Sequence, residues 1–77
     1  MDADAPRDVA VVDVGSNSVR LVVYRQEGRA LWSTYNEKVL AGLGREVAAT
    51  GRLAPDGVAA ALSAIRRFHA MLQARPM

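Results

Sequence analysis

Two valine-rich runs on either side of a turn of small polar residues constrain the fold of this chain more than any other feature. Residues 9–12 and 19–23 consist mainly of valine, and a small-residue turn, 15–18, lies between them. β-Branched residues favour extended strands, and a short polar segment between two such runs favours a tight reversal of the chain. The pattern therefore predicts two neighbouring antiparallel strands joined by this turn.

The rest of the pattern predicts a third strand and one long helix. We expect strands at about 8–13, 19–25 and 30–35, the last with an irregular continuation toward Leu40. Gly28 can supply the positive φ that the second turn needs. Three glycines interrupt residues 41–52, for which no regular structure is expected. Pro55 and Asp56 suit the first turn of a helix that ends near Ala74.

The apolar residues of that helix recur at helical spacing. They predict one buried stripe, which consists of Val58, Ala61, Leu62, Ile65, Phe68 and Leu72. Polar side chains are expected on the opposite face, at Ser63, Arg66, Arg67 and Gln73. Helix and strands together indicate the α/β class with the element order strand, strand, strand, helix.

The first strand indicates that these elements belong to a larger domain. Its almost continuous apolar character predicts burial on both faces, as in a central strand. Only the second strand is an assured neighbour, and a bare apolar edge tends to associate with another strand. We therefore expect residues 8–77 to be the N-terminal part of an incomplete α/β domain, preceded by a mobile N-terminus, 1–7.

Composition excludes several classes of partner. Ten Lys and Arg against eight Asp and Glu give a net charge of only +2, and no basic cluster contains interleaved aromatic residues, so no nucleic-acid partner is expected. Cysteine is absent, which rules out disulfides and cysteine chemistry. No apolar run approaches the ~20 residues of a membrane-spanning helix, and no secretory signal is evident. The expected location is cytoplasmic, without a membrane partner.

The small-residue turn has the chemistry of a phosphate site. Gly15 permits close approach of the backbone, Ser16 and Ser18 add hydroxyl donors, and Asn17 adds amide donors. Successive N–H groups in such a turn can form an anion-binding concavity, and Asp13 beside it could hold Mg²⁺. The plain alternative is an ordinary hairpin turn, which uses the same residue types.

The same residues carry a resemblance to a known family. Residues 10–21 read Ala-Val-Val-Asp-Val-Gly-Ser-Asn-Ser-Val-Arg-Leu, which resembles the first phosphate loop of the exopolyphosphatase / guanosine pentaphosphate phosphohydrolase (Ppx/GppA) family. The resemblance continues through residues 37–44 and 50–53 and into the helix from Pro55. It covers nearly everything from Asp8 to Leu72.

The resemblance implies a ribonuclease-H-like fold, shared with actin, sugar kinases and heat-shock ATPases, and magnesium-dependent hydrolysis of phosphoanhydride bonds. The implied substrates are polyphosphate, which loses its terminal phosphate, and guanosine pentaphosphate, and the implied partners include guanosine tetraphosphate. The residues that would cradle a phosphoryl group are Gly15, Ser16, Asn17 and Ser18. Asp13 would lie near the metal, and Arg20 stands where some members carry an arginine for guanosine phosphate recognition. The family also allows a homodimer of the full-length protein.

The family's catalytic glutamate and second glycine-rich loop have no counterpart in these 77 residues. We therefore expect an acid-anhydride hydrolase as the parent enzyme, with no catalytic residue in this chain and no activity of the chain alone. Two alternatives stay open, a non-catalytic phosphate- or nucleotide-binding module and an inactive gene fragment. The sequence does not separate polyphosphate from guanosine pentaphosphate as the substrate.

Overall fold

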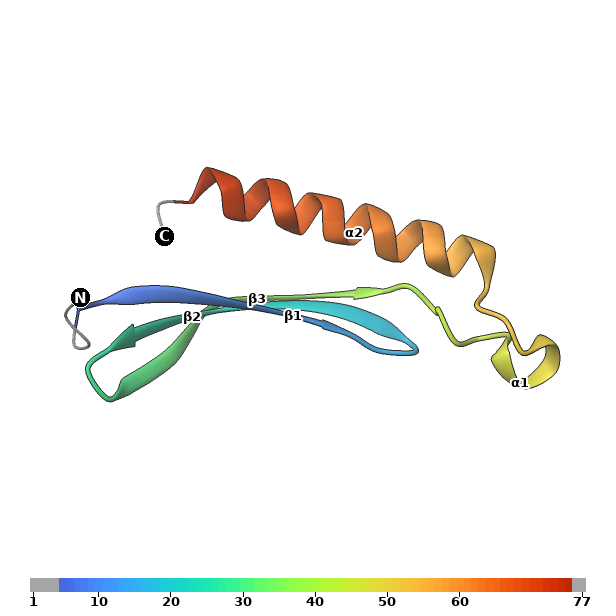
Figure 1. The fold of residues 1–77 in the computed structure, drawn as a ribbon, viewed down its shortest axis with the longest axis horizontal. Helices are drawn as coiled ribbons and strands as arrows, with labels where there is room; N and C mark the ends of the chain where they lie inside the picture. Colours follow the sequence, from blue (N-terminus) through green and yellow to red (C-terminus); the bar gives the residue numbers. More distant parts are fainter. Residues whose placement is uncertain (1–4, 76–77) are drawn as a thin grey trace.

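A computed structural model describes residues 5–75 as a three-stranded antiparallel sheet with one long helix along one face (Figure 1). The predicted α/β class and element order are confirmed. The elements are β1 (Arg7–Val14), β2 (Ser18–Glu27), β3 (Ala30–Leu40), the short helix α1 (Val47–Thr50) and the long helix α2 (Pro55–Ala74). No helix in this part of the chain is both long and apolar enough to cross a membrane.

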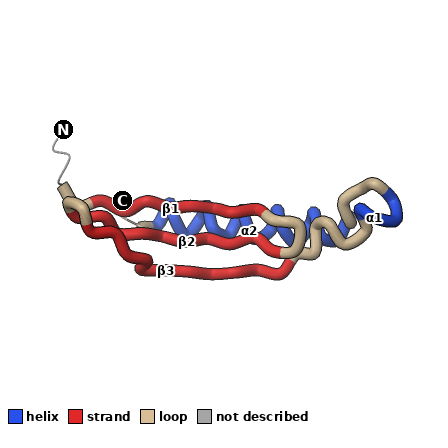
Figure 2. The backbone as a smooth tube through the Cα atoms, turned by 90° about the horizontal axis from the view of Figure 1, so that it is seen from below, coloured by secondary structure: helices blue, strands red, loops and turns tan. Residues whose placement is uncertain are grey.

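The sheet has the order β1-β2-β3, so β2 lies in the middle (Figure 2). Two hairpins place consecutive strands side by side, and Gly28, with φ of 57°, occupies the second turn as predicted. Across β1 and β2, Val14 lies opposite Val19, and across β2 and β3, Val19 lies opposite Val39. The pairing of β2 with β3 is irregular between Val23 and Tyr24.

The core lies between β2 and α2. Alternate residues of a strand point to opposite faces, so Val19, Leu21 and Val23 all face the helix, and each is fully buried. The helix contributes the buried side chains Ala61, Ala64 and Phe68. Because the buried residues of α2 are mostly small, the helix can lie close to the sheet along its length.

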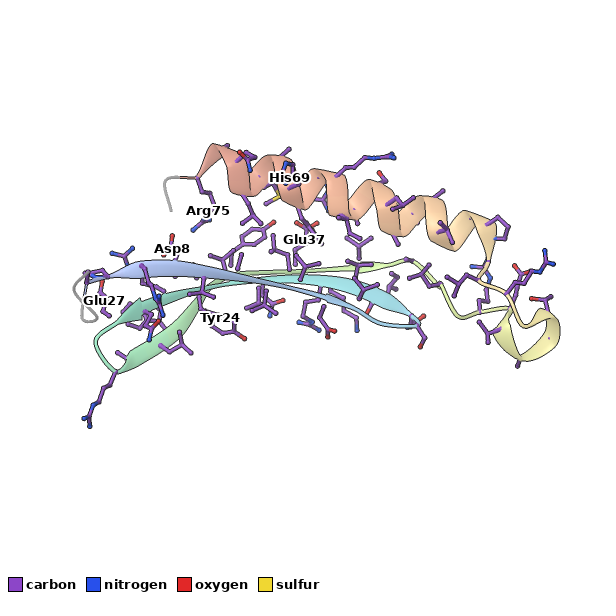
Figure 3. The ribbon with its side chains drawn as sticks, viewed as in Figure 1. Asp8, Tyr24, Glu27, Glu37, His69 and Arg75 are labelled. Carbon is purple, nitrogen blue, oxygen red and sulfur yellow. The ribbon has the colours of Figure 1, made fainter. Side chains whose placement is uncertain are left out.

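Ionic contacts join α2 to the sheet at two further places (Figure 3). Asp8 of β1 lies 3.3 Å from Nη1 of Arg25 and 3.7 Å from Nη2 of Arg75, just beyond the end of α2. Near the middle of the helix, Arg67 contacts Glu37 of β3 through both of its terminal nitrogens. These contacts fix the rotation of α2 above the sheet.

The burial predicted for both faces of the first strand is not seen within residues 5–75. Within residues 5–75, β1 is an edge strand with β2 as its only neighbour, because β3 occupies the other edge of β2. The valines of β1 are 37–51% exposed. The apolar pattern was a correct sign of a strand, but it does not reveal which strands lie beside it.

The predicted helix stripe is confirmed at Ala61, Ile65, Phe68 and Leu72, which are buried or pack against the core, but not at Leu62. Leu62 is 46% exposed, whereas Gly57 and Ala64 are buried. Small residues and Phe68 fill the contact with the sheet, and Leu62 lies outside it. Arg67, predicted to face away, instead reaches Glu37.

Element boundaries differ by a few residues from the predicted ones. β1 and β2 extend beyond both predicted ends, and β3 continues as a strand to Leu40. The segment expected to be irregular contains the single turn α1. Of the N-terminus expected to be mobile, residues 1–4 lie outside the described residues, while Arg7 already pairs with Gln26 in the sheet.

Candidate functional site

The small-residue turn forms one wall of a pocket at the end of the sheet. The pocket has a volume of about 470 Å³ and is lined by Ser16, Asn17, Leu40, Ala41, Gly42, Gly44 and Arg45. Its second wall is the segment that follows β3, residues 41–46, which we call the glycine loop. Among the described residues that line the pocket, Arg45 alone carries a charge.

Main-chain hydrogen bonds hold the two walls together. The carbonyl oxygen of Asn17 accepts from the N–H groups of Ala41 and Gly42, both at 3.0 Å, and the Ser16 carbonyl accepts from Gly44 N–H at 2.7 Å. The turn itself is closed by Gly15 N–H, which donates to the Ser18 carbonyl at 2.9 Å. The carbonyl groups of Ser16 and Asn17 therefore accept hydrogen bonds from the glycine loop.

The N–H groups of Ser16 and Asn17 remain available to a ligand. Within residues 5–75 neither group donates to a backbone carbonyl, and neither side chain makes a hydrogen bond to another protein group. Both residues are exposed and line the pocket. An oxyanion is bound by groups of this kind: neighbouring backbone donors, a hydroxyl and an amide that lie together in a concave site.

Two glycines permit the close packing behind the pocket. A Cβ atom on Gly44 would lie 2.9 Å from Ser16 Cβ. A Cβ on Gly57, in the first turn of α2, would lie 2.9 Å from the Gly42 carbonyl oxygen and 3.0 Å from that of Ala41. The small-residue turn, the glycine loop and the start of α2 are thus stacked against one another, with glycine at each contact.

Neither the backbone conformation nor the packing of the turn requires glycine at position 15. Among the described glycines, the positive φ values belong to Gly28, Gly42 and Gly51, so Gly15 does not use the left-handed region. A Cβ on Gly15 would meet its nearest atom, the Ser18 carbonyl oxygen, at an ordinary 3.5 Å. The protein itself therefore does not require glycine here, and only close approach by a ligand would.

Arg45 lies at the rim of the pocket in a group of exposed charges. Its Nη2 atom contacts the Asp56 carboxylate and lies 3.8 Å from Glu46 Oε2. Nη1 lies over Gly42, 3.0 Å from where a Cβ on that residue would stand. The hydrogen bond from Arg45 holds the pKa of the Asp56 carboxyl below its ordinary value, so Asp56 stays ionised.

The other predicted site residues do not line the pocket, although they lie near it in the chain. Asp13 and Arg20 are directly opposite each other in the register of β1 and β2. Because Val19 and Leu21 face α2, both charges lie on the sheet face without the helix. Nη1 of Arg20 donates to Asn36 Oδ1 at 2.8 Å, and Lys38 lies opposite Arg20 on β3. The structure thus groups Ser16 with Asn17, and Asp13 with Arg20.

Asp13, the predicted metal ligand, offers a single carboxylate. The described residues contain no group of three or more histidine, cysteine or acidic side chains that could hold a metal by themselves. Asp13 is exposed, and within residues 5–75 its carboxylate accepts no side-chain hydrogen bond. Magnesium commonly takes one or two protein carboxylates and completes its shell with phosphate oxygens and water. Asp13 offers one such carboxylate, although it does not line the pocket.

Sequence reasoning missed the second wall of the pocket. The glycine loop was expected to be an irregular connection, and Arg45, Gly44 and Gly57 were not singled out. The available signal was the pair Gly42 and Gly44 directly after a strand, where close main-chain approach is common.

Comparisons with known proteins found no relative of this chain: no family model matches it, and no curated protein matches it.

Proposed function

We propose that this chain is the phosphate-loop region of a magnesium-dependent phosphoanhydride hydrolase of the exopolyphosphatase / guanosine pentaphosphate phosphohydrolase kind. The observation that carries the proposal is the pocket, in which Ser16 and Asn17 present unpaired donors next to the cationic Arg45. The motif of residues 13–18 supports it independently. The ligands would be polyphosphate or guanosine penta- or tetraphosphate, with Arg20 contributing to recognition of the latter.

The proposal includes a ribonuclease-H-like domain larger than the part of the chain described. Its support is the sheet of three antiparallel strands with a helix on one face. The exposed valines on both faces of β1 add to this support, because a further strand beside β1 would bury them. A cytoplasmic location and a homodimer of the full-length protein belong to the same proposal.

The residues of this chain would bind and orient the terminal phosphoryl group. Ser16 and Asn17 would donate to its oxygens, while Asp13 would hold Mg²⁺, which neutralises phosphate charge when bound. No aspartate or glutamate is among the described residues that line the pocket, so the pocket as described offers no carboxylate as a general base. In this proposal the chain supplies binding, and a carboxylate for catalysis comes from elsewhere.

Isothermal titration calorimetry with tripolyphosphate and Mg²⁺ tests the proposal. We expect saturable binding by the 77-residue chain, and about tenfold weaker binding for Asn17→Ala, because one hydrogen bond to a charged ligand is lost. Gln73→Ala is the matched control, since it removes an exposed amide from α2, away from the pocket. Absence of binding, or equal losses in both variants, would contradict the proposal.

A non-catalytic phosphate- or nucleotide-binding module is the second candidate function. The absence of a carboxylate among the described pocket residues favours it. Release of phosphate from short polyphosphate and guanosine pentaphosphate, with Mg²⁺ present and Ser18→Ala as control, tests whether the chain alone is catalytic. Binding without release fits either a module or a hydrolase that needs further residues, whereas release above the Ser18→Ala control would show that the chain is itself catalytic.

A further inference from the structure

Arg45 has the position of a ligand-binding residue, although its side chain is engaged with protein carboxylates. Its backbone is fixed, because Arg45 N–H donates to the Gly42 carbonyl at 3.2 Å and the preceding Gly44 is bonded to Ser16. Its guanidinium lies over Gly42, whose N–H is bonded to Asn17. Arg45 therefore belongs to the same loop whose main chain holds Ser16 and Asn17, the two phosphate-binding candidates, in place.

The contacts of Arg45 with Asp56 and Glu46 can be exchanged for a stronger ligand. The side chains of the three residues are 51%, 75% and 44% exposed, respectively. Ion pairs with this degree of exposure are screened by water and stabilise the protein only weakly. A phosphate chain carries more charge than one carboxylate and offers paired oxygens that match the planar fork of arginine.

Asp56 keeps a partner when Arg45 leaves it. Its Oδ1 atom accepts a hydrogen bond from Gly57 N–H at 3.0 Å, at the first turn of α2. A carboxylate in this place is also favoured by the positive end of the helix dipole. After release of Arg45, the Asp56 carboxylate therefore stays hydrogen-bonded to Gly57 and exposed to water.

From this arrangement we infer that Arg45 exchanges Asp56 for the ligand and binds the second phosphate of a phosphoanhydride chain, while Ser16 and Asn17 bind the first. The inference rests on the proposed function, since it takes the pocket as a phosphate site. It assigns Arg45 as a specificity-determining residue that favours ligands with two or more linked phosphates over orthophosphate. Asp56 holds the arginine at the rim until the ligand arrives.

Calorimetric titration of the 77-residue chain with tripolyphosphate and with orthophosphate, each with Mg²⁺, tests the inference. We expect Arg45→Gln to weaken tripolyphosphate binding about tenfold or more and to change orthophosphate binding little. Arg66→Gln is the matched control, because it removes the same charge from an exposed position on α2 that does not line the pocket. Equal effects of Arg45→Gln and Arg66→Gln would overturn the inference.

Asp56→Asn distinguishes a ligand-binding role from a structural one. If Asp56 competes with the ligand, its loss frees Arg45, and tripolyphosphate should bind several-fold more tightly. If the Arg45–Asp56 pair merely shapes the pocket, Asp56→Asn will weaken binding as much as Arg45→Gln does, which would overturn the inference. Failure of the unaltered chain to bind tripolyphosphate would instead contradict the proposed function itself.

Discussion

Gly44 of the glycine loop donates its main-chain N–H to the Ser16 carbonyl at 2.7 Å, and a side chain on Gly44 would collide with Ser16. This contact joins the two walls of the pocket. A Cβ at 2.9 Å from Ser16 Cβ can be accommodated only if one wall moves. The packing of the pocket therefore depends on a residue outside the motif that first indicated it.

Gly44→Ala should separate the two walls and reduce stability. Overpacking of a tight contact typically costs about 1–3 kcal/mol, and the displaced Ser16 should also bind phosphate less well. Urea denaturation measures the first effect and tripolyphosphate titration the second. A variant with unchanged stability and binding would mean that the walls are not packed together as described.

Gly15→Ala should weaken tripolyphosphate binding while leaving the stability of the fold nearly unchanged. The added Cβ meets only the Ser18 carbonyl oxygen, at an ordinary 3.5 Å, so we expect the denaturation midpoint to change little. Tripolyphosphate binding should fall clearly, because the methyl group blocks close approach of an oxyanion to the turn. Full retention of binding would show that the ligand does not approach the turn at Gly15.

The Glu37–Arg67 pair predicts a component of stability that depends on pH. Hydrogen bonds from Arg67, and then from Tyr35 at 2.5 Å, lower the pKa of Glu37 from 4.5 to about 2. The folded-state pKa lies below that of the unfolded chain, so this stabilisation is present above pH 4.5 and is lost as the pH falls toward about 2. Glu37→Gln should remove that part of the acid sensitivity and lower stability at neutral pH.

Denaturation midpoints across this pH range measure the effect. Tyr35→Phe serves as the graded control, because it removes the weaker of the two hydrogen-bonding influences on Glu37 and leaves Arg67 in place. Over the same pH interval, Tyr35→Phe should reduce the acid sensitivity of the denaturation midpoint less than Glu37→Gln does. Identical acid sensitivity in the unaltered chain and Glu37→Gln would contradict the assignment of this ion pair.

The exposed edge of β1 predicts self-association. Val11 is 46% exposed on a strand with one free edge, and such edges pair with other chains. Val11→Lys should reduce association, because an edge lysine disfavours pairing with a second strand. Sedimentation velocity over a range of protein concentrations measures this. A monomeric unaltered chain at all concentrations would show that β1 does not attract a partner strand.

The sequence was a good guide to local structure. The β-branched runs predicted β1 and β2, Gly28 predicted the second turn, and Pro55 marked the first residue of α2. These features depend on the backbone preferences of a few neighbouring residues, and those preferences follow directly from the residue types. The small-residue turn, too, was correctly placed between two strands.

The sequence was a poorer guide to relationships between distant segments. The edge position of β1 depends on which strand pairs with which, and Arg67 reaches the sheet through Glu37, which is thirty residues away in the sequence. The second wall of the pocket arises for the same reason, because Gly44 and Ser16 meet only after β2 and β3 have paired. Local patterns do not contain this information.

The most direct test of the pocket as a phosphate site is the map of backbone amide shifts during titration with magnesium and tripolyphosphate. We predict the largest changes at Ser16, Asn17 and residues 42–45, which line the pocket or hold its walls together. Changes confined to Arg20 and Lys38 on the helix-free face, or spread over the arginines of α2, would place the anion elsewhere and contradict the account.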